Sequence, residues 1–407
     1  MKRSMLLVTL LVAISMILAA CAPAAAPATQ APAATQPPAA PAAATKITLW
    51  HSYHAGGSEE TAINTLVANW NKAHTDIQVE ALEIPFDQIE KKYTTEVAAG
   101  AGPDMFTMPN DNLGQWVRDG VVAPVDDLLK GKLDAYDKSG VSGLTVDGKL
   151  YGVPGIIKAV GLFYNKTNVQ TPPATTADLL AAVKAGKKLT IMVGDGAPYF
   201  NYGWFPGFGT TIFDNTGKCV ADTNGGADAM QFLLDLKSAG ATFDTDGGKA
   251  ATAFKQGETD MIVDGPWMLG DYEKALGDKL GVAAMPAGPK GPSQPFSGID
   301  GWYLNPNSKN GAAAMTVALY LFGPDGLKTY ADVAGDPPVM SSVTTKDPLV
   351  GDFFKIAAGG YPRPQAKWFG NYWGPFTDMY TAVLEGGTAP ADAVKAACAT
   401  MNKNNAQ

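Results

Sequence analysis

The stretch from residue 46 to residue 108 alternates strand patterns with helix patterns, and this alternation limits the possible folds. Residues 46–50, 77–82 and 105–108 have the length and apolar content of short strands. The intervening segments carry apolar residues on one helical face, as Ile63, Leu66, Val67 and Trp70 do. Strands that alternate with helices form mainly parallel sheets, and similar patterns continue along the rest of the chain. The sequence therefore predicts an α/β fold.

The N-terminus has the pattern of a secretory leader. Lys2 and Arg3 precede an apolar run over residues 5–18 that is too short to span a membrane comfortably. Leu18-Ala19-Ala20-Cys21 resembles a bacterial lipobox, which is cleaved before the cysteine. We therefore expect a lipoprotein signal peptide over residues 1–20 and a lipid on Cys21. The alternative is an ordinary secretory signal that happens to contain a cysteine.

Residues 22–45 consist almost entirely of Ala, Pro, Thr and Gln and carry no charge. Such a segment has nothing to pack, so we expect residues 21–45 to form a disordered tether behind the lipidated cysteine. The tether would hold a globular body on the extracytoplasmic side of a membrane. Whether that side is a periplasm or the cell surface is left open.

Charge and metal-ligating residues narrow the function. The net charge of −8 argues against nucleic-acid binding, which requires basic patches. The three histidines and three cysteines form no zinc-binding pattern, so we expect neither metal nor cofactor. Cys219 and Cys398 could pair in an oxidising compartment, but their spacing does not decide it.

A turn at Asp111 is a candidate binding site. The predicted strand at residues 105–108 ends in Pro109-Asn110-Asp111-Asn112. Ligands of open α/β sheets bind just outside the carboxyl ends of strands, so the Asp111 carboxylate is expected to face a cleft. The alternative is a plain surface turn, since Asn and Asp favour turns.

From residue 46 onward the chain resembles the extracellular solute-binding proteins of ABC importers, in the maltose/maltodextrin-binding branch of family 1. The resemblance rests on landmarks in the right order, and it covers nearly the whole mature chain. These landmarks are Trp50, Gly102-Pro103-Asp104, Asn110-Asp111, Gly120-Val121 with Pro124, Leu150-Tyr151-Gly152-Val153-Pro154, Phe163-Tyr164-Asn165-Lys166, Pro198-Tyr199-Phe200, and Phe254-Lys255-Gln256-Gly257-Glu258-Thr259 leading into Asp264-Gly265-Pro266-Trp267.

The resemblance implies a two-lobed periplasmic-binding-protein-like fold of type II, with a hinge and a ligand cleft between the lobes. Each lobe would take pieces from both halves of the chain. We expect residues 46–156 and 302–346 in lobe I, and residues 157–301 and 347–407 in lobe II. Closure of the lobes over the ligand is the expected motion.

The resemblance also implies aromatic platforms for sugar rings, which have an apolar face. Tyr199 and Trp267 match two family positions, with loop packing and core packing as their alternatives. A third platform is expected in residues 368–376. Ungapped counting favours Phe376 there, and Tyr372 and Trp373 are also candidates. Trp302, close to a hinge, could either stack on ligand or pack in the core. Two predictions of secondary structure bear on these residues: a loop over 198–205 and a helix over 373–385.

Polar positions of the expected site differ from the maltose-type pattern. Asp111 matches a family carboxylate that binds sugar hydroxyls, but Asn112 stands in place of an arginine and Met108 in place of a tryptophan. Lys158 stands where the family has a glutamate, and it donates where that residue accepts. Its alternative is a solvated surface lysine. The remaining differences lie in the loop after the predicted strand at residues 46–50. There, Ser52 and His54 stand in place of an Asn and an Asp of the family.

These features predict a lipid-anchored receptor that binds a sugar or oligosaccharide and delivers it to membrane permease subunits, acting as a monomer and not as an enzyme. A binding protein for a polyol or another oligosaccharide is the first alternative. A secreted glycoside hydrolase is the second, and it would need two carboxylates flanking one bond. Asp104 and Asp111 would be separated by the strand between them.

Overall fold

The computed structural model describes residues 44–406. The predicted signal peptide, the lipidation site Cys21 and nearly all of the predicted tether lie outside the described residues. The described residues belong to one compact unit. Among its described helices, none combines the length and the hydropathy needed to cross a membrane.

The first sheet contains the predicted strand–helix–strand start. Strand β1 pairs in parallel with β2 and β3, while β12 pairs antiparallel with both β3 and β6. The strand order is β13-β12-β3-β1-β2, with β6 paired to β12. The strands are β1 (Thr45–His51), β2 (Ile77–Glu83), β3 (Met105–Pro109), β6 (Gly152–Lys158), β12 (Phe296–Leu304) and β13 (Tyr361–Pro362).

The second sheet has the order β11-β7-β10-β8-β9. Its side chains alternate between two apolar layers, as strand geometry requires. Met261 and Val263 of β10 belong to one buried cluster, and Ile262 between them belongs to another. The strands are β7 (Gly161–Asn165), β8 (Leu189–Met192), β9 (Thr242–Asp244), β10 (Met261–Asp264) and β11 (Leu280–Ala283).

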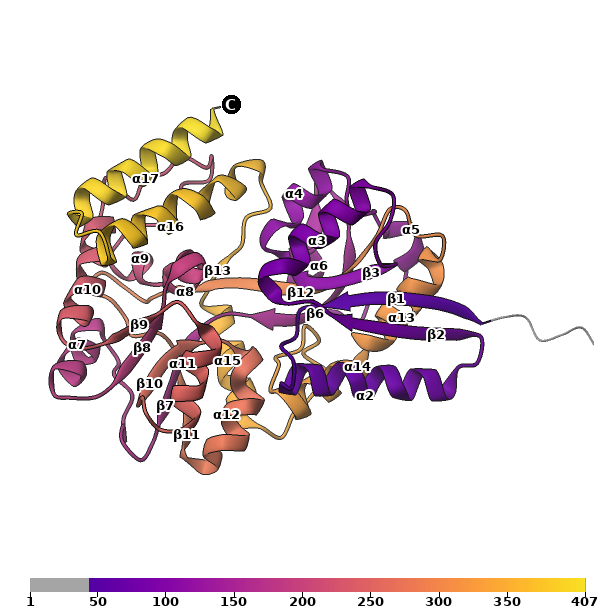
Figure 1. Ribbon diagram of the computed structural model, residues 1–407, viewed down its shortest axis with the longest axis horizontal. Coiled ribbons are helices and arrows are strands. Elements are labelled where there is room, and N and C mark those ends of the chain that lie inside the picture. The colour runs from indigo at the N-terminus through magenta and orange to yellow at the C-terminus, as the bar shows by residue number, and fades with distance from the viewer. Residues whose placement is uncertain (1–43, 407) are drawn as a thin grey trace, which may run out of the picture. The chain divides into compact units, whose positions relative to one another are not determined.

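Helices cover both sheets, and early and late parts of the chain meet around each (Figure 1). Around the first sheet lie α2 (Ser58–Ala73), α3 (Phe86–Ala98), α4 (Leu113–Arg118), α5 (Asp126–Leu129), α6 (Lys138–Gly143), α13 (Gly311–Leu321) and α14 (Pro324–Ala334). Around the second lie α7 (Thr176–Lys184), α8 (Ala197–Asn201), α9 (Trp204–Gly207), α10 (Gly226–Ser238), α11 (Gly247–Lys255), α12 (Leu269–Leu276), α15 (Pro348–Ala358), α16 (Gly370–Leu384) and α17 (Pro390–Asn405).

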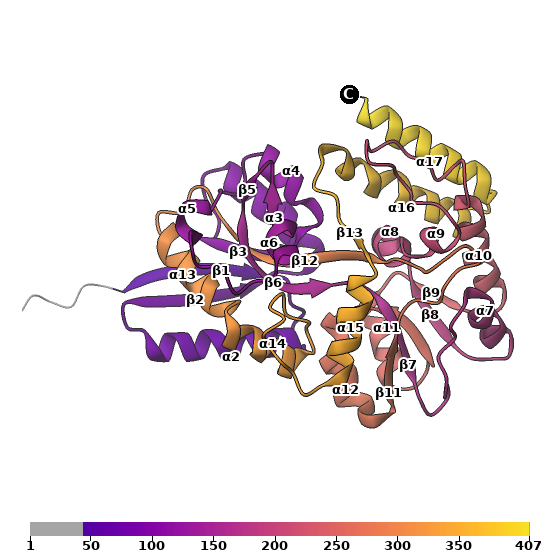
Figure 2. The same cartoon turned by 180° about the vertical axis from the view of Figure 1, so that it is seen from behind.

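Two paired strands run from one buried core to the other, and the reverse view shows them between the two bodies (Figure 2). In β12, Phe296 belongs to a core of the second sheet, whereas Trp302 and Tyr303 belong to the core of the first. In β6, Ile156 lies in the first core and Lys158 ends the strand. These two paired strands connect the two bodies.

Local sequence signals explain several elements. Asp147 and Gly148 form the hairpin turn between β4 (Thr145–Val146) and β5 (Lys149–Leu150), and both turn residues have positive φ. Helix α7 begins with a capping box, in which Thr175 and Asp178 satisfy each other's backbone N–H groups.

A disulfide joins Cys219 to Cys398. The sequence left this pairing open because the two cysteines are 179 residues apart. Both cysteines belong to the same buried cluster. The bond links helix α17 to the segment before α10.

One prediction of secondary structure was wrong, and one predicted helix starts earlier than expected. Residues 198–205 contain the short helices α8 and α9 instead of a loop, because Tyr202, Trp204 and Phe205 are all buried. Helix α16 begins at Gly370, one turn earlier than predicted, and continues through Pro375. This earlier start decides which aromatic residues of the segment face the core.

Candidate functional site

The centre of the candidate site is a partly buried ion pair between Asp111 and Arg363. Asp111 lies in the short 3₁₀ helix η1 (Asn110–Asn112), directly after the carboxyl end of β3. Its Oδ1 accepts a hydrogen bond from Nη1 of Arg363, which follows β13. Burial raises the pKa of Asp111, and the Arg363 charge opposes this rise. The pair joins chain segments 252 residues apart in sequence.

The local backbone makes room for the Arg363 side chain and fixes its approach. A Cβ atom at Gly298 would lie 2.3 Å from Cζ of Arg363, so only glycine leaves that space free. Two residues beyond Arg363, the Gln365 amide donates to the Asn110 carbonyl over 3.0 Å and accepts from the Gly114 N–H over 3.1 Å. The segment that follows β13 is thereby held against η1 and α4.

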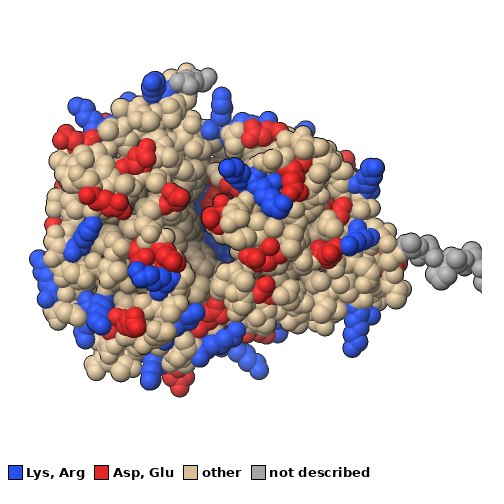
Figure 3. All heavy atoms as spheres, viewed as in Figure 1, with Lys and Arg blue, Asp and Glu red and all other residues tan. Residues whose placement is uncertain are grey.

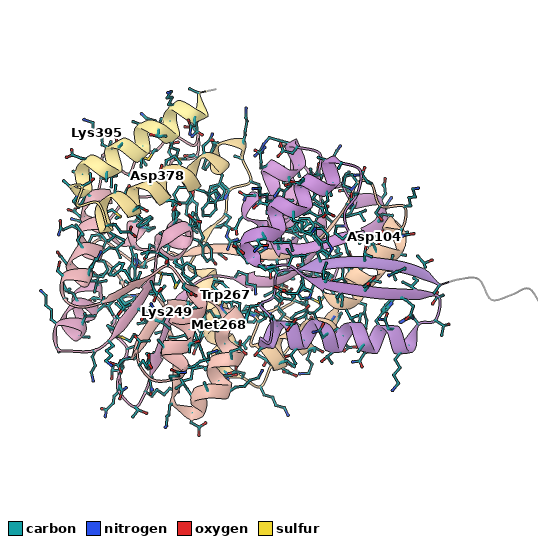
Figure 4. The ribbon with its side chains drawn as sticks, viewed as in Figure 1. Asp104, Lys249, Trp267, Met268, Asp378 and Lys395 are labelled. Atoms are coloured by element: carbon teal, nitrogen blue, oxygen red, sulfur yellow. A yellow bond between two sulfur atoms is a disulfide. The ribbon has the colours of Figure 1, made fainter. Side chains whose placement is uncertain are left out.

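Two aromatic rings continue this row of contacts. The guanidinium of Arg363 lies 4.8 Å from the ring centre of Tyr199, and the rings of Tyr199 and Trp267 are 6.0 Å apart. Both aromatic side chains are only half-buried. Trp267 lies in η3 (Pro266–Met268), at the carboxyl end of β10, and Figure 4 labels it near the middle of the view, well away from Asp104. Half-buried rings beside fixed charges provide both stacking surfaces and hydrogen-bonding groups.

Lys158 is surrounded by carboxylates. Its Nζ lies 2.5 Å from Glu59 Oε1, 3.0 Å from Asp336 Oδ1 and 3.5 Å from Asp300 Oδ2. Burial by itself would lower the pKa of Lys158, but the three carboxylates outweigh it and the pKa is raised well above its usual value. We call these four residues the Lys158 cluster. The ammonium is also 5.9 Å from the Trp267 ring, so the cluster adjoins the aromatic pair.

A second polar contact links the loop after β1 to helix α12. Nε2 of the exposed His54 lies 2.9 Å from Asp271 Oδ2, and the Ser58 hydroxyl donates to the other oxygen of the same carboxylate. Burial alone would raise the pKa of Asp271, but these hydrogen bonds lower it. A hollow of about 370 Å³ opens beside them. The contact joins the two bodies at the rim of the site.

Buried His51 makes the free energy of unfolding of the protein depend on pH. Its side chain is 2% exposed, and burial lowers its pKa to about 4. The unfolded chain, with a histidine pKa near 6.5, then binds more protons between about pH 4 and 6.5, so stability rises with pH over this window. We expect His51→Gln to remove about 3 kcal/mol of this pH dependence.

The measurement is urea unfolding at pH 4.5 and pH 7 for both proteins. Asp300 and Asp264, whose pKa values burial raises to about 6, act in the opposite sense, so the difference between wild type and variant isolates His51. Equal losses of stability on acidification in the two proteins would contradict the prediction.

Three predicted ligand contacts lie in the core instead. Tyr372 is fully buried and donates to the Pro198 carbonyl over 2.8 Å, and Phe376 is fully buried one turn later on α16. The early start of α16 places both on its apolar face. Trp302 is fully buried against Phe322 in the core of the first sheet. We therefore no longer propose these three side chains as ligand contacts.

The remaining predicted residues occupy varied places. Asn112 donates to both carboxylate oxygens of Glu90 over 3.0 Å, which turns its amide toward α3. Ser52 is half-buried in the loop after β1, and Trp373 is half-buried on α16 beside Phe296. Lys158 is buried in its cluster, so the alternative of a solvated surface lysine was wrong.

Sequence reasoning missed Arg363, Glu59, Asp300 and Asp336 as members of the site. Arg363 carried one signal, because it is a rare arginine held between Pro362 and Pro364. The three acids carried none, since each becomes notable only through its distance from Lys158.

Comparison with known proteins identifies the family. The profile of the bacterial extracellular solute-binding proteins matches residues 65–355, well over half of the chain. The chain belongs to this family. The predicted two-lobed α/β fold is confirmed for this solute-binding protein by a solved relative, a maltotriose-binding protein of Thermus thermophilus bound with maltotriose. That structure has 31% sequence identity and a TM-score of 0.79, over 88% of this chain and 99% of its own.

Curated relatives agree with the family assignment. A maltooligosaccharide ABC transporter solute-binding lipoprotein of Streptococcus pneumoniae is 27% identical over 332 residues, which are 74% of this chain and 77% of the relative. A galactooligosaccharide-binding protein of Bacillus subtilis is 24% identical over 420 residues, covering 95% and 94% of the two chains.

The solute-binding protein is not an enzyme, because its family and these relatives are binding proteins. The geometry agrees for the two carboxylates that the hydrolase alternative invoked. Asp104 accepts hydrogen bonds from Thr48 and Ser308 at the start of β3, and Asp111 lies beyond the end of that strand.

Proposed function

We propose that this solute-binding protein is the sugar-binding subunit of an ABC importer, and that its ligand is a maltooligosaccharide or a similar oligosaccharide. The observation that carries the proposal is the row formed by Asp111, Arg363, Tyr199 and Trp267, which combines half-buried aromatic rings with oriented charges. Sugar rings stack on such platforms through their apolar faces while their hydroxyls bind the charged groups.

The relatives support this reading. The Thermus thermophilus protein was solved with maltotriose, and the Streptococcus pneumoniae relative is a maltooligosaccharide-binding lipoprotein of an ABC transporter. The Bacillus subtilis relative binds galactooligosaccharides, which favours another oligosaccharide as the second candidate ligand.

The proposed lobes are residues 46–156 with 302–346, and residues 157–301 with 347–407. Ligand would enter when they separate, and closure would bring Arg363 and Tyr199 toward Asp111. The His54–Asp271 contact at the rim would then close with them. We further propose that the monomer is lipid-anchored through Cys21 on the outer side of a cell membrane and delivers the sugar to permease subunits there.

Trp267 provides the direct test. We expect saturable binding of maltotriose to the wild-type protein by isothermal titration calorimetry, and at least about ten-fold weaker binding to Trp267→Ala, since burying one apolar ring contributes about 1.5–3 kcal/mol. The matched control is Trp368→Ala, because Trp368 is equally half-buried but packs against Phe213. Its affinity should equal that of the wild type.

Other outcomes redirect or overturn the proposal. Binding of galactooligosaccharides without maltotriose would keep the sugar receptor and change its specificity. Equal affinities of Trp267→Ala and wild type would remove Trp267 from the site. No response to malto-, galacto- or monosaccharides would contradict sugar binding itself.

A further inference from the structure

The Lys158 cluster has more negative charge than its single ammonium can neutralise. Glu59, Asp300 and Asp336 are each at most 4% exposed, and all three lie within 3.5 Å of Lys158 Nζ. A buried carboxylate requires a hydrogen-bonded or charged partner, because removing it from water is costly. Burial raises the pKa of Glu59 well above its usual value and so favours its neutral form, and the excess negative charge of the cluster then lies on Asp300 and Asp336, which share one ammonium.

Unused acceptors show where that excess lies. Oδ1 of Asp300 and Oδ2 of Asp336 are buried and accept no hydrogen bond within the described residues. The Lys158 ammonium has three N–H donors, and its contacts with the three acids already occupy them. Two more buried groups lack partners here, the hydroxyls of Tyr53 and Tyr330, and the charges of all three acids act on both. Groups of this kind are rarely left unpaired in a native protein.

The cluster lies where the two bodies meet. Lys158 ends β6, Asp300 lies on β12, Glu59 lies in the first turn of α2, and Asp336 follows α14. Opposite them, η3 with Trp267 packs against α2 and α14. Figure 3 shows a hollow between the two bodies with acidic and basic atoms along its floor. Within residues 44–406, no group of His, Cys, Asp or Glu side chains is placed to hold a metal ion.

We propose that the ligand carries a cationic amine, which binds to Asp300 and Asp336 while a sugar ring rests on Trp267. The inference rests on the proposed function and narrows its substrate class to oligosaccharides with a basic nitrogen. An ammonium group supplies several donors and one positive charge, which the free acceptors and the excess negative charge both require. Burial raises the pKa of Asp300 to about 6, and a bound cation would lower it again.

The test compares maltotriose with amino-deoxy maltotrioses, in each of which one hydroxyl is replaced by an amine, and with the same compounds after N-acetylation. Calorimetric titration at pH 7 should show at least one amine that binds about ten-fold or more tightly than maltotriose, equivalent to about 1.4 kcal/mol. N-acetylation, which removes the charge, should abolish the gain.

Variants assign the gain to the two acids. Asp300→Asn and Asp336→Asn keep the side-chain shape and should each reduce the preference for the amine at least three-fold, with thermal melting confirming a folded protein. The control is Asp332→Asn, which changes an exposed acid of α14 and should keep the full preference.

The outcomes separate the two proposals. If maltotriose binds and no amine binds more tightly, the inference is overturned while the sugar receptor stands. A preference for the amine that survives in both Asn variants also overturns it, because the charge would then be read elsewhere. If neither maltotriose nor any amine binds, the proposed function fails and the inference fails with it.

Discussion

Replacing Lys158 by methionine is expected to lower the free energy of unfolding by about 3–5 kcal/mol, the usual cost of removing one partner from a buried ion pair. Methionine fills the volume of the lysine stem but leaves Glu59, Asp300 and Asp336 without the ammonium that contacts them. Urea unfolding at pH 7 measures the loss. Because the uncompensated carboxyls can take up protons instead, the loss should become smaller at pH 5.

The matched control is Lys355→Met on α15. Lys355 pairs with Asp352, but its side chain is 80% exposed, so its removal should leave the stability nearly unchanged. A Lys158→Met protein as stable as this control at pH 7 would show that the three acids are neutral in the folded protein. The excess negative charge on which the cationic-ligand inference depends would then be absent.

Removing the disulfide should have an effect of similar size. The Cys219–Cys398 bond closes a loop of 179 residues, for which the chain-entropy model gives about 5 kcal/mol and measurements on other proteins about 2–5 kcal/mol. We expect the Cys219→Ala, Cys398→Ala double variant to unfold at correspondingly lower urea. The affinity for ligand should change little, because both cysteines are buried in the core that α16 and α17 share, away from the candidate site residues Asp111 and Trp267.

The wild-type protein treated with a reductant serves as the control for the double variant. Reduction should reproduce its loss of stability, and reductant should have no further effect on the variant. A wild type that is insensitive to reductant would mean that the two cysteines do not pair in solution.

The fold could be predicted where local patterns and tertiary packing agree. The strand–helix start was clear because Ile63, Leu66 and Trp70 follow one helical face, and all three pack in the first core. The prediction of a loop over residues 198–205 was wrong because closely spaced polar and aromatic residues are also typical of a solvent-exposed loop. Their helices depend on burial against α16, which is far away in sequence.

The same distinction applies to the candidate site. Asp111 follows the end of a strand, so the rule for the carboxyl edges of sheets predicted it, whereas Trp267 was predicted from the family resemblance. Arg363 was missed because its role depends on contacts with Asp111 and Tyr199, both of which lie far away along the chain. Charges that meet only through folding leave no pattern in a single sequence.

The antiparallel pairing of β12 with β3 has a consequence for how the protein is made. Thr107 finds its partner Trp302 only after most of the chain has been synthesised. Until then the outer edge of β3 exposes unpaired N–H and C=O groups, which are a template for aggregation. This edge remains a risk for aggregation until residue 304 has emerged and β12 can pair with it. Slow translocation should therefore reduce its yield more than it would for a protein whose first sheet is complete within its first hundred residues.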